Sequence, residues 1–211
     1  MPEIIETTVY QLNELSDAAK DRARSWYREH GLFDDWHEPV YDDFQQICAI
    51  LGVELKTTSV RLFGGGTARK PRIYFSGFWS QGDGACFEAT YAYARAAAAK
   101  IRKHAPRDAE LHAIVDALQA SQHRNFYQLT ADITHRGRYY HEHSIDISVE
   151  RDGAAMTADA EGAVIDSLHD LARWLYRHLE REYEYQTSDA VIDEALLANA
   201  YTFTAEGRRF G

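Results

Sequence analysis

The chain is poor in the residues that mark secreted and membrane proteins. It has 211 residues with only two cysteines and four prolines, and no uninterrupted apolar run reaches the roughly 18 residues of a membrane span. Two cysteines do not make a disulfide framework, so Cys48 and Cys86 are expected to be reduced core thiols. The opening residues MPEIIE lack the basic and apolar regions of a signal peptide. These absences predict a cytoplasmic protein that does not act at a membrane.

Positive charge is also in deficit. The chain has 23 lysines and arginines against 33 aspartates and glutamates, a formal net charge of -10. Proteins bind a nucleic-acid backbone through clustered lysines and arginines, which neutralise phosphates and release their counterions. The overall negative charge of this chain would repel the phosphates. We therefore do not expect direct nucleic-acid binding, and we expect another protein as the partner. The sequence leaves a homo-oligomer open.

Hydrophobic residues make up 45% of the chain and aromatic residues 12%, enough for a buried core. Apolar residues recur at helical spacing in some segments and alternate in others. Helices are expected over residues 17–30, 38–51, 94–105, 108–122, 159–185 and 189–198, and extended segments over 4–12, 53–55, 73–88, 125–150 and 201–204. Strands in hairpins and helices in runs predict an α+β fold, an antiparallel sheet of hairpins covered by helices on one face. We expect a single domain over residues 1–211.

Residues 64–71 interrupt this pattern. Three consecutive glycines are followed by a basic pair before proline, a composition that resists regular structure. The segment is expected to be a mobile loop.

The most informative stretch is residues 73–88, a hairpin whose turn is Gly-Asp-Gly at residues 82–84. It could be a purely structural turn, a loop that contacts a partner, or a hard-metal site using carboxylate oxygens. A second candidate is Trp36, which lies in the acidic segment 34–43, where the acids could equally stabilise a helix N-terminus. The candidate binding residues are Trp36, Phe78, Trp79, Ser80, Gln81, Asp83 and Glu88.

Three histidines occupy odd-numbered positions in the hairpin expected around Gly137. On that register His135, His141 and His143 would lie on one face, and three imidazoles can hold zinc or another divalent metal. The neighbouring residues Tyr139 and Arg138 are equally typical of an exposed aromatic and basic rim, where histidines are simply solvated.

Several motifs together resemble an uncharacterised family of phages and bacterial mobile elements, sometimes labelled an antitoxin of a toxin-antitoxin stability system. The motifs are LSDAAK at residues 15–20 with Trp26-Tyr27, YFSGFWSQGDGACFE at 74–88, NFYQL at 125–129, HRGRY at 135–139 and YEY at 183–185. The resemblance implies no catalytic or ligand-binding residue. Residues 64–71 depart from it as an insertion before the central block.

Two classes of function compete. The leading interpretation is a non-enzymatic protein, without a cofactor, that neutralises a toxin or host-defence component through an acidic, aromatic surface. No serine lies in a Gly-x-Ser-x-Gly elbow, so a Ser-His-Asp triad cannot be argued. The alternative is a metal-dependent hydrolase that uses the three histidines, and a third hypothesis is an acidic mimic of nucleic acid.

Overall fold

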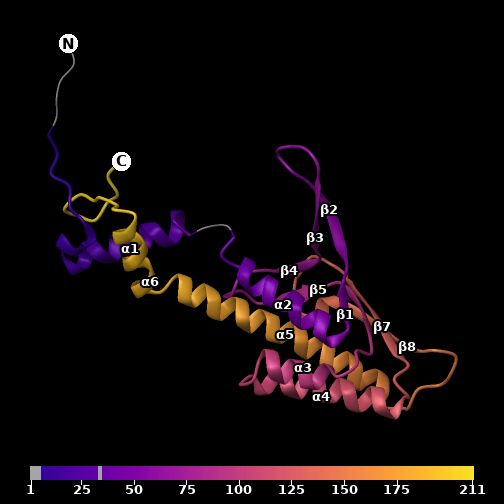
Figure 1. Ribbon diagram of the computed structural model, residues 1–211. Coiled ribbons are helices and arrows are strands. Elements are labelled where there is room, and N and C mark those ends of the chain that lie inside the picture. The colour runs from indigo at the N-terminus through magenta and orange to yellow at the C-terminus, as the bar shows by residue number, and fades with distance from the viewer. Residues whose placement is uncertain (1–5, 33–34) are drawn as a thin grey trace. The chain divides into compact units, whose positions relative to one another are not determined.

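The computed structural model describes residues 6–32 and 35–211 (Figure 1). Helices and antiparallel strands confirm the predicted α+β fold. The helices are α1 (Asp17–His30), α2 (Glu38–Leu51), α3 (Ala97–His104), α4 (Ala109–Arg124), α5 (Ala160–Gln186) and α6 (Asp189–Ala198), with 3₁₀ turns η1 (Leu12–Glu14) and η2 (Glu142–Ser144). The strands are β1 (Val53–Leu55), β2 (Thr57–Arg61), β3 (Thr67–Pro71), β4 (Ile73–Phe75), β5 (Ala85–Phe87), β6 (Ala89–Ala92), β7 (Leu129–His135) and β8 (Ile145–Arg151).

The chain divides into two compact units. The smaller comprises Met1–Glu38 and Arg181–Gly211, and the larger comprises Pro39–Glu180. Helix α5 contributes residues to both. The expected single domain over residues 1–211 stays a prediction. No helix in the described part of the chain combines the length and the apolar character needed to cross a bilayer.

The smaller unit is built on α1 and α6. The guanidinium of Arg24 donates to both carboxylate oxygens of Asp193 at 2.7 and 2.6 Å and so links the two helices. The strands expected at residues 4–12 and 201–204 are wrong for the described residues, which contain only isolated bridges there, Tyr10 with Phe203 and Phe203 with Arg209. Residues 1–5 lie outside the described part. The core consists of Leu12, Leu15, Ala19, Ala23, Tyr27, Ile192, Leu196 and Phe203.

The larger unit contains a four-stranded antiparallel sheet in the order β1-β6-β7-β8. Along β7 the side chains alternate, with Leu129, Ala131 and Ile133 buried while Thr130 and Asp132 are exposed. Helices α2, α4 and α5 supply the other layer of buried side chains. The exposed side of the sheet carries a shallow groove of about 370 Å³. Helices therefore cover one face, as the alternation predicts.

Strand β7 begins later than the sequence pattern suggested. Phe126 and Tyr127 have φ values of 55° and 61°, so residues 125–128 turn rather than extend. After this turn, the side-chain amide of Gln122 on α4 forms two hydrogen bonds with the backbone of Leu129. It donates to the Leu129 carbonyl at 2.7 Å and accepts from the Leu129 amide at 3.2 Å. This buried amide aligns α4 with the start of β7.

The prediction of a mobile loop at residues 64–71 is wrong for its second half. Residues Thr67–Pro71 form β3, which pairs antiparallel with β2. Gly65 and Gly66 have φ values of 85° and 91°, conformations that favour glycine, and they make the turn. The glycines therefore reverse the chain between two strands.

Candidate functional site

The tip of the β4–β5 hairpin, residues 76–84, is a turn closed by Asp83. Beyond the last strand pair, Phe75 with Ala85, the amide of Ser76 donates to the carbonyl of Gly84 at 3.0 Å. One carboxylate oxygen of Asp83 accepts from the amides of Trp79 and Ser80, at 3.0 and 2.7 Å. The turn conformation is therefore held by hydrogen bonds to the backbone.

Aromatic rings hold this tip against α5. Phe78 lies between Phe75 and Tyr176, with ring centroids at 6.2 and 5.5 Å. The Tyr176 hydroxyl donates to the carbonyl of Gly77 at 3.2 Å. Phe78 thus anchors the hairpin, whereas the adjacent Trp79 is 78% exposed.

The tip also packs against the β7–β8 connection, residues 136–144. The rings of Tyr74 and Tyr140 stack at 5.3 Å. A Cβ on Gly82, whose φ is +94°, would lie 3.4 Å from the Tyr139 ring. At Gly84 a Cβ would lie only 2.5 Å from that of His141, a separation that real side chains do not adopt. The glycines of the Gly-Asp-Gly turn therefore allow two distant segments to touch.

These contacts produce one exposed surface, which we call the aromatic face: Trp79, Ser80, Gln81, Arg138 and Tyr139. Tyr139 is 48% exposed, and the Arg138 guanidinium lies 4.8 Å from its ring centroid and donates to its hydroxyl at 2.6 Å. Tryptophan, tyrosine and arginine are the residue types that dominate binding energy at protein interfaces. The arrangement is suited to contact with another protein.

The other predicted binding residues lie elsewhere or have other roles. The carboxylate of Asp83 accepts the two backbone hydrogen bonds that close the turn. The side chain of Glu88 is 14% exposed and pairs with Arg72 at 2.9 Å. Trp36 belongs to the smaller unit, where its ring contacts that of Tyr183 at 5.4 Å. Residue 34 of the acidic segment lies outside the described residues. Among the predicted binding residues, Asp83 is therefore the one acidic side chain in the described tip.

The three histidines predicted as a metal site are not assembled as ligands, and this prediction is corrected. His135 ends β7, where its Nε2 donates to the carbonyl of Tyr139 at 2.9 Å. His141 and His143 lie in the connection rather than on a strand, and Nδ1 of His141 accepts from the His143 amide at 3.1 Å. Within residues 6–32 and 35–211, no three histidine, cysteine or acidic side chains are placed to hold a metal ion. The alternation that predicted the site ends where β7 ends.

A family model described as a domain of unknown function (DUF8835) matches residues 36–189, most of the chain. The chain belongs to the DUF8835 family. No curated protein and no solved structure matches it. The DUF8835 match includes the hairpin tip, the 136–144 connection and all of α5. The resemblance to a mobile-element family stays a prediction.

A histidine that the sequence patterns missed lies beside the connection in the DUF8835 domain. The ring of His169 on α5 is 5.2 Å from that of His143. Its Nε2 is buried and has no hydrogen-bond partner among the described residues. Burial lowers the pKa of His169, the nearby His143 and Arg173 lower it further, and Glu142 and Asp166 oppose this. No local motif marks His169, because its partner is distant in sequence.

This environment predicts a loss of stability in acid. The folded pKa of His169 lies below the ordinary value of 6.5, so the unfolded chain binds the proton more readily. The free energy of unfolding should therefore fall as the pH drops through 6.5. His169→Gln, which cannot titrate, should reduce this fall in urea titrations at neutral and acidic pH. An equal fall in His169→Gln and in the unmodified protein would contradict the assignment.

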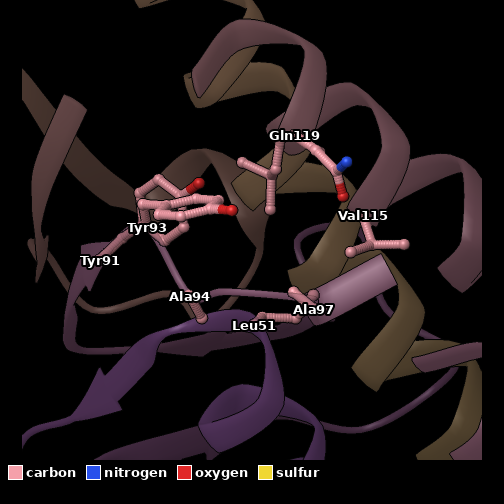
Figure 2. A pocket seen from close by; sticks show the side chains of 8 residues that line it. Leu51, Tyr91, Tyr93, Ala94, Ala97, Val115 and Gln119 are labelled. Carbon is pink, nitrogen blue, oxygen red and sulfur yellow. The ribbon is translucent and has the colours of Figure 1, made fainter. Parts of the chain in front are cut away.

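A small cavity lies between the end of β6 and α2, α3 and α4 (Figure 2). Its volume is about 10 Å³, room for about one water molecule. Leu51 and Val115 line it together with Tyr91, Tyr93 and Gln119. Small-molecule sites occupy several hundred Å³, so this cavity is a packing defect of the DUF8835 core.

Proposed function

We propose that this DUF8835 protein is a non-enzymatic binding protein that neutralises a partner protein, such as a toxin or a host-defence component, through its aromatic face. The observation that carries the proposal is the exposed side chain of Trp79 on a turn fixed by Asp83. An aromatic anchor on a rigid turn loses little conformational entropy on binding.

The composition around Trp79 supports a protein partner. Arg138 and Tyr139 extend the contact area with hot-spot residue types, and Ser80 and Gln81 supply hydrogen-bonding groups. The net charge of -10 favours a partner with a basic surface, because long-range attraction would accelerate their encounter.

The cysteines are consistent with this proposal. Cys48 and Cys86 are unbridged and buried, which supports a cytoplasmic location. Burial raises the pKa of the Cys86 thiol to about 11, so the thiol stays protonated near neutral pH. A protonated, buried thiol is a poor nucleophile.

Substitution of Trp79 tests the proposal. Tagged protein purified from its native host at physiological salt should bring down one stoichiometric protein partner. With that partner purified, Trp79→Ala should weaken binding about 30-fold in calorimetry, the size of a hot-spot loss of about 2 kcal/mol.

Phe126→Ala provides the control. Phe126 is also exposed, at 72%, and lies outside the aromatic face. Its substitution should leave the affinity within about twofold, as for most surface changes. Failure to recover any stoichiometric protein, or equal losses in the two variants, would reject the aromatic face as the binding surface.

A further inference from the structure

The β2–β3 hairpin forms an exposed ribbon that the proposed function does not use. We call residues 56–72 the arm. Every residue of β2 is exposed, and β3 is exposed or half-buried. Figure 1 shows the two strands and their connecting turn extending away from the other strands of the larger unit.

The arm is basic in an acidic protein. Residues 56–72 contain three arginines and two lysines and no aspartate or glutamate, whereas the whole chain carries a net charge of -10. At the base, Lys56 pairs with Asp132 at 2.8 Å and Arg72 with Glu88 at 2.9 Å. Among the described residues, Lys56 and Arg72 are the cations of the arm that form ion pairs, and the outer three, Arg61, Arg69 and Lys70, form none.

Cross-strand register places two of these cations together. Arg61 pairs with Thr67 and Ser59 pairs with Arg69, so all four side chains lie on the same face of the ribbon. Lys70 lies opposite Thr58 on the other face. Arginine, lysine, serine and threonine are the side chains that bind nucleic-acid phosphates.

The end of the arm is apolar. The amide of Leu62 donates to the carbonyl of Gly66 at 3.1 Å, and the amide of Gly65 donates to that of Leu62 at 3.1 Å, so the turn is closed by its own backbone. Leu62 is 49% exposed and Phe63 is fully exposed. A turn that displays phenylalanine between cationic strands can contact bases while the strands contact phosphates.

We propose that the arm binds double-stranded DNA, with the ribbon in the major groove. Arg61, Arg69 and Lys70 contact phosphates, and Phe63 contacts base edges such as the thymine methyl group. The major groove of B-DNA is about 12 Å wide and admits a two-stranded ribbon, whereas the deep, narrow major groove of duplex RNA does not. The chemistry and the shape of the arm both fit this ligand.

The net charge of the chain does not prevent this contact. Five residues at about 3.4 Å each give β2 a length of about 17 Å. The Debye length at physiological salt is about 8 Å, so the field of the acidic residues beyond the base is largely screened at the outer end. The local charge of the arm therefore governs the approach of a duplex.

The test is anisotropy of a labelled duplex of about 20 base pairs titrated with the full-length protein, between about 50 and 200 mM NaCl. Three phosphate contacts predict a slope of log K against log salt of about -2.7. The triple variant Arg61→Ala/Arg69→Ala/Lys70→Ala should bind at least about tenfold more weakly at the lower salt and flatten the slope. Phe63→Ser should weaken binding without changing the slope.

A charge-matched control separates the arm from a general loss of positive charge. Lys100→Ala/Lys103→Ala/Arg107→Ala removes three exposed cations elsewhere in the larger unit and should leave the affinity within about twofold. Absence of duplex binding at low salt, or equal weakening by both triple variants, overturns the proposal. Duplex RNA bound as tightly as DNA, or phosphatidylserine vesicles bound in place of the duplex, also overturns it.

Discussion

Replacing Trp174 with alanine is expected to lower the free energy of unfolding by about 3–5 kcal/mol. Trp174 on α5 is 2% exposed, and its ring stacks on Phe44 of α2 at 6.3 Å. Its indole nitrogen donates to Asp108 at 2.7 Å, and the other carboxylate oxygen of Asp108 caps α4 through the amide of Leu111. The variant therefore opens a cavity and removes a hydrogen bond that joins α5 to α4. Urea titration followed by circular dichroism measures the loss.

Trp79→Ala is the matched control, because it removes the same side chain from an exposed position. Its effect on unfolding should be far smaller than that of Trp174→Ala, although it should be the more damaging variant for partner binding. Equal destabilisation by the two variants would show that Trp174 does not hold the layers of the larger unit together.

Replacing Gly84 with alanine is expected to cost about 3 kcal/mol of stability, the upper end of the range for overpacking. The added Cβ would lie 2.5 Å from the Cβ and 2.7 Å from the Cα of His141, and 2.8 Å from the carbonyl oxygen of Tyr140. Two of these atoms are backbone, so a side-chain rotation cannot relieve the overlap. The hairpin tip and the 136–144 connection must separate, which should weaken partner binding together with stability.

Gly162→Ala is the control for this change. Gly162 lies in α5, and a Cβ there would meet no atom within 4 Å outside the helix's own backbone. Alanine should stabilise the helix by about 0.5–1 kcal/mol. If Gly84→Ala unfolded at the same urea concentration as the unmodified protein, the close contact between the tip and His141 would be contradicted.

Much of the secondary structure could be predicted from short-range patterns. Ser16 before an acidic first turn and Gly31 after the last turn bracket α1, and β1 and α6 have the predicted bounds. The Gly-Asp-Gly turn correctly indicated a hairpin between β4 and β5. Each of these signals lies within a few residues of the feature that it specifies.

The candidate site was predicted only in part. Trp79 and its neighbours were recognised as a binding candidate, and the structural turn that the sequence left open is present, with one carboxylate oxygen of Asp83 accepting from two backbone amides. His141 and His143 were placed on a strand, since alternation was extended through residues that form a turn. A carboxylate's hydrogen-bond partner depends on the path of the turn, which residue types alone do not describe.

The amino-acid sequence on its own specified the α+β class, the excess of acidic residues and the presence of an aromatic hairpin. Packing alone joined that hairpin to the 136–144 connection, turned the His135 ring to the carbonyl of Tyr139, and placed unpaired cations on an exposed ribbon. The difference is physical. Caps, turns and periodicity act between near neighbours, whereas contacts such as Gly84 with His141 require distant elements to settle into one core first.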